Sequence, residues 1–404
     1  MPDALADPPP MLDCRYFRAG RCRSCTLIET PYARQVQEKD AACRDRLPQV
    51  PASAWLPPFT AGDRGFRNRV KLVVGGRAGR ITLGILDPDG AGVDLRECQI
   101  QSPGIASVLP PLAALLDRTG LAPYDVPARR GEIKFVHLTE APTEPGSADE
   151  SGGGALMLRF VVRTERGLGR LRDELAEIRR VVPRARVISV NLLPEHKAVL
   201  EGDQEYVLWG ETLPIRLGGV TLHLRPQSFF QTNTRVAEAL YAQVAAWVDD
   251  LAPASLWDLY CGVGGFALTC AAPGRRVTGV ELSEHAVDSA RRSAREAGVS
   301  ATFLAADAWD FAREAAAEQL PETLIVNPPR RGLGAELSEW IEASPIRSVV
   351  YSSCNPESLA RDLAAMPGFA VSAARVFDMF PHTRHVECAV LLTRTAPGTR
   401  SAVS

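Results

Sequence analysis

The sequence lacks the features that would place a protein in or across a membrane. No apolar run approaches the roughly 18 residues that a membrane-spanning helix needs. The first ten residues are acidic and rich in proline, without the basic and apolar segments of a secretory signal. We therefore expect a cytoplasmic protein with no membrane partner, in which residues 1–10 form a disordered leader.

An excess of charge of one sign is also missing. The chain has 46 basic and 48 acidic residues, so its net charge of −2 gives no indication of a nucleic-acid partner. Locally, two stretches are rich in basic residues: Arg64, Arg67, Arg69, Lys71, Arg77 and Arg80 in the first, and Arg159, Arg163, Arg166, Arg170 and Arg172 in the second. Such stretches suit contact with RNA phosphates, although solvated strand faces would look similar.

Histidines are few, at six, but cysteines number nine. In a cytoplasmic protein, this number favours metal binding or catalysis over a disulfide framework. The N-terminal pattern is Cys14-x7-Cys22-x2-Cys25, followed much later by Cys98. Three closely spaced cysteines and a distant fourth fit a zinc ion and an iron–sulfur cubane equally well. Cys43 is left outside this set.

The length of 404 residues predicts two or three domains. Residues 11–50 form a cysteine-rich region with a polar helix near its end. Alternating residues between 66 and 86 predict a β-hairpin that turns at Gly75 and Gly76. The pattern then predicts a helix at 105–118, strands at 133–139 and 155–163, a helix at 167–180 and a strand at 186–192. Together these elements describe an α+β domain over residues 51–215.

Strands and helices alternate regularly over residues 216–396. Strands are predicted at 256–260, 276–282, 301–306, 323–327, 347–353, 370–377 and 386–393, with helices near 265–272, 284–297, 308–318, 335–343 and 356–365. Such alternation predicts a parallel sheet covered by helices on both faces. Seven strands that end in an antiparallel hairpin describe a Rossmann-like α/β fold of the class I S-adenosylmethionine methyltransferase type. Residues 397–404 are predicted to be a flexible tail.

A glycine-rich turn follows the first of these strands, in the segment LWDLYCGVGGF at 256–266. Glycines allow a ligand to approach the backbone closely. An acidic residue at the end of the next strand, Glu281, is placed to accept hydrogen bonds from the two hydroxyls of a ribose. Asp307, after the third strand, is placed for the adenine edge. The turn lacks the G-x-G-x-x-G spacing of a nicotinamide dinucleotide site, which we therefore set aside.

The segment NPPR at 327–330 follows the fourth strand. Its prolines fix a rigid turn, so the Asn327 amide is held at the edge of the cleft, where it can bind a base. A similar segment with an aromatic residue in the fourth position occurs in amino-group methyltransferases. Arg330 stands in that position here, which disfavours N-methylation.

A cysteine follows the predicted strand at 347–353, and a carboxylate lies at the start of the predicted final strand at 386–393. Cys354 lies in SSCN at 352–355, at the C-terminal tip of an apolar strand, where open α/β sheets bind ligands. Glu387 ends the segment FDMFPHTRHVE at 377–387. Methylation of a pyrimidine at C5 requires a nucleophile that adds to C6 and a base that removes the C5 proton. Both groups are therefore candidate catalytic residues, with Asp378, His382 and His385 as candidates for supporting them.

These segments together resemble the signatures of the RNA uracil-C5 methyltransferase family. The resemblance includes NPPR, SSCN and FDMFPHTRHVE, as well as RPQSFFQTN at 225–233, which is similar to the family's entry into its catalytic domain. It extends over residues 11–394. It implies that Cys354 is the nucleophile and Glu387 the base.

The resemblance also implies the cofactors. Gln231, Tyr260, Glu281 and Asn327 match the family's contacts with S-adenosylmethionine. The resemblance further implies that a [4Fe-4S] cluster, rather than zinc, is bound by Cys14, Cys22, Cys25 and Cys98. The predicted fold is thus a class I methyltransferase domain, preceded by an α+β RNA-binding domain and an N-terminal iron–sulfur region.

Within the family, the cysteine cluster without a preceding β-barrel module is similar to bacterial enzymes that methylate uridine 747 of 23S ribosomal RNA. The expected partner is therefore a flipped loop uridine of that RNA, bound by a monomer. The same chemistry on another ribosomal site or on the T-loop uridine of transfer RNA is the alternative. An iron–sulfur redox or radical protein and a catalytically silent RNA-binding scaffold are further alternatives, but the former lacks Cys-x3-Cys-x2-Cys. The latter would leave the pairing of Cys354 with Glu387 unexplained.

Overall fold

The computed structural model describes residues 11–143, 153–197 and 199–395. The predicted leader at 1–10 and the predicted tail at 397–404 lie outside these residues. No helix in the described ranges is long and apolar enough to cross a membrane.

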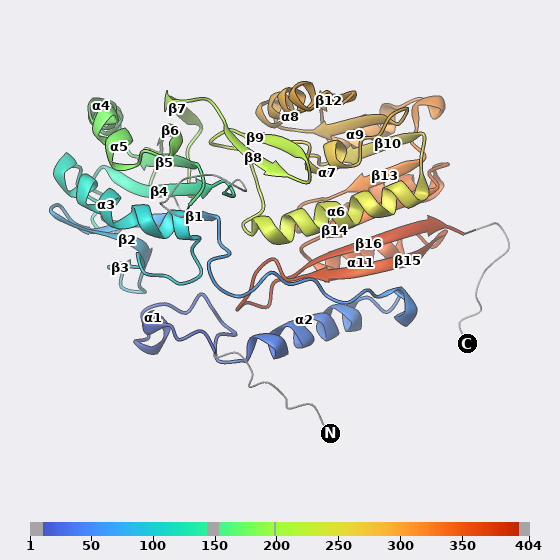
Figure 1. Ribbon diagram of the computed structural model, residues 1–404, viewed down its shortest axis with the longest axis horizontal. Coiled ribbons are helices and arrows are strands. Elements are labelled where there is room, and N and C mark those ends of the chain that lie inside the picture. The colour runs from blue at the N-terminus through green and yellow to red at the C-terminus, as the bar shows by residue number, and fades with distance from the viewer. Residues whose placement is uncertain (1–10, 144–152, 198, 396–404) are drawn as a thin grey trace.

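The first half of the chain forms a seven-stranded mixed sheet within the described residues, in the order β3-β2-β1-β4-β5-β6-β7 (Figure 1). The strands are β1 (Arg69–Arg77), β2 (Arg80–Leu86), β3 (Gly92–Asp94), β4 (Ile133–Glu140), β5 (Leu156–Val162), β6 (Ala185–Leu192) and β7 (Gln204–Trp209). Helices α3 (Pro103–Thr119), α4 (Glu165–Asp173) and α5 (Leu175–Val181) pack on one face of this sheet. Leu72, Val136, Phe160 and Ile188 supply the sheet's side of this core.

The predicted hairpin exists, but its predicted turn is wrong. Strand β1 continues through Gly75 and Gly76, and the chain turns at residues 78–79, since Arg77 pairs with Arg80. The two glycines instead allow close approach of backbone: a Cβ on Gly75 would lie 2.7 Å from the Cα of Gly92, which begins β3. Gly75 is therefore explained by the packing of a third strand, whereas Gly76 has a φ of 79° and a Cβ on it would meet the carbonyl oxygen of Arg80 in β2.

The second half of the chain forms the predicted seven-stranded sheet, in the order β12-β11-β10-β13-β14-β16-β15 among the described residues. The strands are β10 (Ser255–Leu259), β11 (Arg276–Glu281), β12 (Ala301–Ala305), β13 (Thr323–Val326), β14 (Ser348–Ser353), β15 (Phe369–Phe377) and β16 (Glu387–Arg394). Strand β16 runs antiparallel to both of its neighbours, and the pairs among β10–β14 are parallel. This topology confirms the predicted class I methyltransferase fold.

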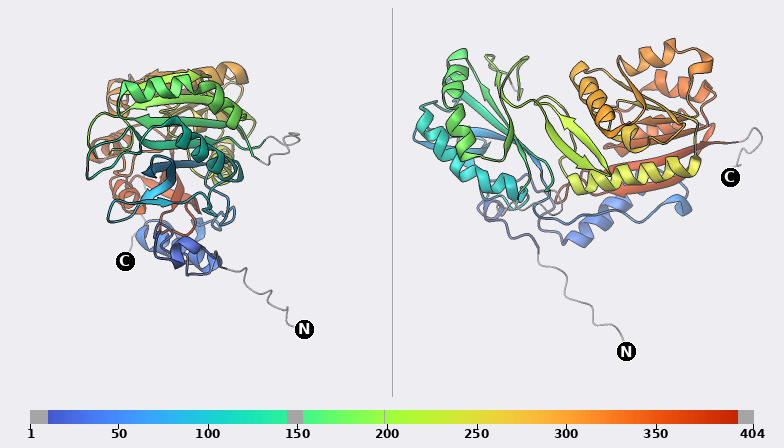
Figure 2. Two further views of the ribbon diagram at one scale, coloured as in Figure 1. Left: turned by 90° about the vertical axis from the view of Figure 1, so that its left-hand side faces the viewer. Right: turned by 45° about the horizontal axis from the view of Figure 1, so that its top comes forward.

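Helices cover both faces of this sheet, as the alternation predicts. Helices α6 (Thr234–Leu251), α7 (Gly265–Thr269) and α8 (Glu284–Ala297) share one core. Helices α9 (Ala308–Glu314), α10 (Ala335–Ala343) and α11 (Pro356–Ala364) share the other. Helix α2 (Tyr32–Arg46) joins this second core through Cys43, so a segment near the N-terminus lies alongside the C-terminal strands (Figures 1 and 2).

A small hairpin lies between the two sheets (Figure 2). Strands β8 (Leu213–Leu217) and β9 (Val220–Leu224) pair with each other, and Ile215 and Leu222 pack in the core that holds α6 and α8. The expected boundary between residues 215 and 216 falls inside β8. The hairpin itself packs with the C-terminal half.

The cysteine-rich segment begins with the short helix α1 (Arg15–Arg18). Tyr16 packs there with Val93 and Leu95, which lie in and just after β3. A 3-10 turn, Ala52–Ala54, follows α2. The N-terminal segment thus contacts both the first sheet and the helical face of the second.

Candidate active site

The glycine-rich turn after β10 holds an acidic side chain at its rim. Gly262 and Gly264 have φ values of 55° and 86°, a conformation that L-residues adopt rarely. The N–H of Gly262 donates to Glu281 Oε2 at 3.1 Å, and the N–H of Ser283 donates to Glu281 Oε1 at 3.0 Å. A Cβ on Gly264 would meet the Phe303 ring at 3.0 Å, whereas space around Gly262 is open. The turn and the carboxylate therefore form a cradle that suits a nucleoside.

The predicted S-adenosylmethionine residues lie along one edge of the sheet. Tyr260, Glu281 and Asn327 stand at or just after the C-terminal ends of β10, β11 and β13, which are adjacent in the sheet. Gln231 is buried and lies three residues before α6. Asp307 caps α9 by accepting hydrogen bonds through Oδ1, so its expected contact with adenine would use its other oxygen. The edge position agrees with the sequence-based hypothesis, and the individual contacts stay predictions.

Below this turn lies a buried carboxyl group that the sequence analysis did not single out. Asp258 is fully buried and accepts a hydrogen bond from the N–H of Ala267 at 2.9 Å. Burial raises its pKa to about 8, and Glu281 adds to the rise. The bond joins β10 to α7 across the glycine turn, so Asp258 supports the turn's shape. In the sequence, an acidic residue inside the otherwise apolar strand LWDL could have indicated this buried carboxyl group.

Cys354 directly follows β14 and is half-buried. Burial and the neighbouring Glu387 raise the pKa of its thiol, whereas the guanidinium of Arg330 lowers it. Arg330 therefore favours the thiolate, which is the reactive form of cysteine. Arg330, which stands where amino-group methyltransferases have an aromatic residue, thus also lowers the pKa of the Cys354 thiol.

Glu387 begins β16 beside the same end of β14. The register pairs Ser353 with Cys388, which brings Glu387 next to Cys354. Its carboxyl group is buried, and burial raises its pKa to about 7. The hydrogen bond that Ser352 Oγ donates to Glu387 Oε1 at 2.5 Å acts in the opposite direction and lowers this pKa. A carboxylate with a pKa near neutrality is suited to accept a proton. The structure thus brings the two predicted catalytic residues together and adds Ser352, whose role the sequence did not reveal.

The loop between β15 and β16 is attached to α2 by buried polar contacts. Lys39 Nζ lies 2.6 Å from Asp378 Oδ1 and donates to the carbonyl of Phe380 at 2.9 Å. Tyr32 Oη donates to Asp378 Oδ2 at 2.7 Å. Both members of the ion pair are almost completely buried, at 4% and 2% side-chain exposure. Asp378 therefore fixes the path of the loop that leads to Glu387.

His382 makes a second attachment of this loop. It adopts a φ of 63°, its N–H donates to Gln35 Oε1 at 2.9 Å, and its carbonyl accepts from the N–H of Leu27 at 2.9 Å. Leu27 comes two residues after Cys25. The cysteine-rich segment is therefore joined directly to the loop at 378–386 between β15 and β16, which we call the catalytic loop because it leads to Glu387. The hypothesis that His382 supports the site is consistent with these contacts.

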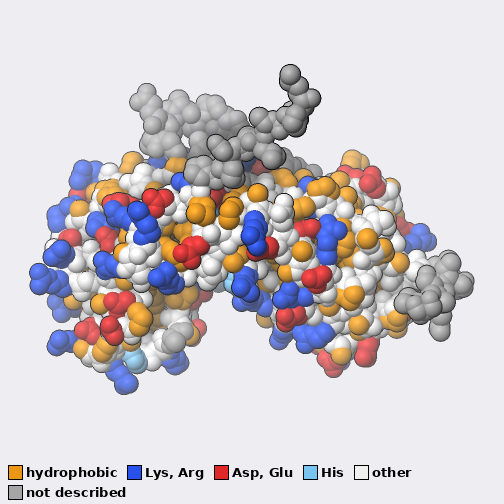
Figure 3. Space-filling view, turned by 90° about the horizontal axis from the view of Figure 1, so that it is seen from below, with side chains coloured by type: hydrophobic (Ala, Val, Ile, Leu, Met, Phe, Trp, Pro, Cys, Tyr) orange, Lys and Arg blue, Asp and Glu red, His pale blue; other side chains and the backbone are white. Residues whose placement is uncertain are grey.

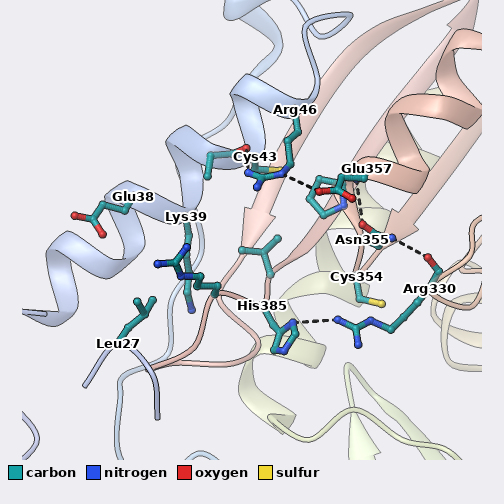
Figure 4. A pocket seen from close by; sticks show the side chains of 14 residues that line it. Leu27, Glu38, Lys39, Cys43, Arg46, Arg330, Cys354, Asn355, Glu357 and His385 are labelled. Atoms are coloured by element: carbon teal, nitrogen blue, oxygen red, sulfur yellow. Dashed lines mark hydrogen bonds and ion pairs between the residues drawn. The ribbon is translucent and has the colours of Figure 1, made fainter. Parts of the chain in front are cut away.

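A pocket of about 390 Å³ opens beside the nucleophile (Figure 4). It is lined by α2, by Arg330, by the start of α11 and by the loop that precedes Glu387. In Figure 4 the guanidinium of Arg330 lies near the Cys354 thiol, and a dashed line joins Arg330 to His385. That contact is 3.2 Å long, from Arg330 Nη2 to His385 Nδ1.

The four predicted metal-binding cysteines are half-buried. Burial raises the pKa of Cys25 to about 12, and the thiols of Cys98, Cys22 and Cys14 add to this rise, so the four lie near one another. Among the described residues, no three His, Cys, Asp or Glu side chains converge where they could hold a single metal ion. Cys43 lies in the core against Cys388, which agrees with its exclusion from the set.

Three of the arginines expected to contact RNA make contacts within the protein. Arg159 is 2% exposed and forms ion pairs with Glu201 and Glu205. Arg69 is half-buried and donates to the carbonyl of Ser228 at 2.7 Å, and Arg67 is half-buried and donates to the carbonyl of Arg69 at 3.2 Å. On the face shown in Figure 3, basic side chains are interspersed with acidic ones. Arg159 is therefore corrected, since its charge is neutralised within the fold, whereas contact of the other arginines with RNA stays a prediction.

Comparisons with known proteins agree with this geometry. The sequence matches a family model described as tRNA (Uracil-5-)-methyltransferase over residues 171–395. It is 46% identical over 388 residues to the 23S rRNA (uracil(747)-C(5))-methyltransferase RlmC of Halothiobacillus neapolitanus, covering 95% of this chain and 100% of the relative. It is 40% identical over 385 residues to the protein of the same name from Shigella boydii, again covering 95% and 100%.

A solved structure also resembles the whole arrangement. It is the Pyrococcus abyssi tRNA (uracil-54, C5)-methyltransferase in complex with S-adenosyl-L-homocysteine. The two structures superpose with a TM-score of 0.73 at 26% sequence identity, covering 91% of this chain and 85% of that one.

Proposed function

The chain belongs to the RNA uracil-C5 methyltransferase family, and from that membership we propose that it methylates C5 of uridine 747 in 23S ribosomal RNA. The single observation that best supports this chemistry is the half-buried thiol of Cys354 beside the buried carboxyl group of Glu387. Both lie at the edge of the sheet where Tyr260, Glu281 and Asn327 gather.

Each residue has a defined task in the proposed reaction. The Cys354 thiolate adds to C6 of the uracil, which gives C5 the character of an enolate carbon. S-adenosylmethionine supplies the methyl group that C5 then takes up. Glu387 removes the remaining proton from C5, and the electron pair left behind re-forms the C5–C6 double bond and expels the thiolate. A pKa of about 7 leaves Glu387 partly ionised at neutral pH and able to accept this proton.

The cradle fits the proposed methyl donor. The Glu281 carboxylate is held by two backbone N–H groups at the rim of the glycine turn, where it can accept hydrogen bonds from a ribose. Gln231, Tyr260 and Asn327 are proposed to complete the binding site. Asn327 also lies one strand from Cys354, in position to contact the target base.

The four N-terminal cysteines are proposed to hold a [4Fe-4S] cluster. Thiolates are the donors that such clusters use, and Cys14, Cys22, Cys25 and Cys98 lie near one another. These four cysteines would supply one thiolate ligand each, and the cluster would link the segment around Cys14, Cys22 and Cys25 to Cys98. Because Leu27 bonds to His382, we infer that the cluster stabilises the segment that supports the catalytic loop.

We infer a cytoplasmic monomer with a cysteine-rich region at 11–50, a central RNA-binding domain and a methyltransferase domain that ends near residue 396. Since the β8–β9 hairpin packs with the C-terminal core, the division between these two domains is placed before Leu213.

A test of the target is to map 5-methyluridine in ribosomal and transfer RNA from a deletion strain. The proposal expects loss of the modification at uridine 747 of 23S RNA and its restoration by the wild-type gene, but not by Cys354→Ala. Loss from the transfer-RNA T-loop, with uridine 747 still methylated, would instead establish the alternative substrate. That alternative has support in the solved structure of similar fold, which is named for uracil 54 of tRNA.

A further inference from the structure

The pocket beside Cys354 is formed by parts of the chain that do not bind the methyl donor. Its walls come from α2, from residues 354–357 and from residues 384–386 of the catalytic loop, with Arg330 at one side (Figure 4). None of Tyr260, Glu281 and Asn327 is among its lining residues. The pocket therefore opens from the nucleophile in a direction separate from the cofactor cradle.

Most charged groups of this pocket are paired. Lys39 is held by Asp378, Glu38 is 2.7 Å from Arg34, and Arg46 is 3.6 Å from Glu357. Each pair offsets the charge of the pocket residue that it holds, and the pair of Lys39 with Asp378 is buried.

Two guanidinium groups of the pocket differ from the rest. In the part of the chain that the structure describes, Arg330 and Arg384 have no carboxylate partner within ion-pair distance. His385 accepts from Arg330 through Nδ1, and burial together with Arg330 lowers the pKa of that imidazole, which keeps it neutral. The carbonyl of Arg330 accepts from Asn355 Nδ2 at 2.9 Å. Arg330 is thus oriented but not neutralised.

We propose that this pocket binds an RNA phosphodiester next to the target uridine, with Arg330 and Arg384 as its charged ligands. This inference rests on the proposed function. A uracil whose C6 meets the Cys354 thiol must have its flanking backbone within one nucleotide of the pocket. The planar guanidinium forks present paired N–H donors that match the oxygens of a phosphate.

The test is a double-mutant cycle of RNA affinity, in which one change is an arginine substitution in the protein and the other is the neutralisation of one phosphate in the RNA. Short stem-loops carry uridine at the target and a single neutral methylphosphonate, placed at the target's 5′ phosphate, at its 3′ phosphate or at a distant stem position. Affinity is measured in the Cys354→Ala background, so that neither adduct formation nor thiol ionisation contributes. Arg384→Ala should weaken binding of unmodified RNA by roughly tenfold, as expected for the loss of a charged hydrogen bond.

The inference predicts that this effect disappears with one of the two adjacent methylphosphonates and persists with the distant one. Arg384→Lys should retain most of the affinity, because it keeps the charge. Arg330→Ala, measured the same way, should show the same dependence on that phosphate. The matched control is Arg347→Ala, which removes an exposed arginine at the opposite end of β14. It should change neither the affinity for unmodified RNA nor the affinity for the methylphosphonate RNAs.

Equal loss for Arg384→Ala with all three methylphosphonates would overturn the inference, since the arginine would then not contact either phosphate beside the target. No loss with unmodified RNA would overturn it as well. Failure of the proposed function is distinguishable, because the wild-type protein would then form no adduct with a 5-fluorouridine stem-loop of any kind.

Discussion

Replacing Lys39 by methionine should weaken the attachment of the catalytic loop to α2. The change leaves the Asp378 carboxylate buried at 2% exposure, and among the described residues the hydroxyl of Tyr32 is its remaining side-chain donor. It also removes the hydrogen bond from Nζ to the carbonyl of Phe380. Removing one partner of a buried ion pair typically costs about 3–5 kcal/mol, and the additional lost bond places Lys39→Met in the upper part of that range.

Urea unfolding followed by fluorescence measures this loss, provided that the slope of the transition is unchanged. The double variant Lys39→Met/Asp378→Asn should recover at least half of the stability, because no uncompensated charge then stays buried. Arg34→Met is the matched control on the same helix. Its partner is Glu38 at 2.7 Å, but both side chains are largely exposed, so the expected loss is below about 1 kcal/mol.

The same variant should affect one chemical step more than another. The loop held by Asp378 leads into Glu387, so removal of the C5 proton should slow more than addition of Cys354. The reaction of each protein with RNA and S-adenosylmethionine is stopped at short times by rapid quench, and the protein–RNA adduct that already carries the methyl group is quantified. Lys39→Met should accumulate more of this adduct than wild type. A loss of stability under 1 kcal/mol together with unchanged rates for both steps would refute the reasoning that this ion pair positions the loop.

Three further predictions concern the base, its hydrogen-bond donor and the cysteines. Product release should rise with pH, with a midpoint near pH 7, because Glu387 accepts a proton only when ionised. Glu387→Gln should accumulate methylated adduct, and normal release by that variant would require another base. Ser352→Ala removes a bond that lowers the pKa of Glu387, so the midpoint of the release profile should move to higher pH, and a shift to lower pH would contradict this role. Anaerobically purified protein should be brown with about four irons per chain; Cys25→Ser should remove the colour and Cys43→Ser should not, whereas a colourless protein with one tightly bound zinc would contradict the cluster.

The catalytic half was predictable from sequence because its elements are local and regular. Apolar strands alternate with amphipathic helices, and the strands after residue 250 lie within a residue or two of their predicted bounds. Cys354 was identifiable because it follows a strand at the ligand-binding edge of the sheet, and Glu387 because it begins a strand at the same edge. The hairpin turn was misplaced because Gly75 and Gly76 indicate close backbone approach as readily as a turn.

Long-range pairing explains what the sequence could not reveal. Arg159 belongs to a basic stretch, but Glu201 and Glu205 from a later part of the chain neutralise it. The bond between Lys39 and Asp378 joins residues 339 positions apart, and no local pattern indicates it. The burial that raises the pKa of Glu387 likewise depends on the assembled sheet and its helices.

The most direct test of the proposed chemistry uses a 23S RNA fragment with 5-fluorouridine at position 747. The fragment is incubated with the protein and S-adenosylmethionine, and the products are digested and analysed by mass spectrometry. The fluorine cannot be removed by Glu387, so the account predicts a stable adduct in which Cys354 is joined to a 5-methylated 5-fluorouridine. An adduct at another residue, or no adduct while the uridine fragment is still methylated, would contradict it.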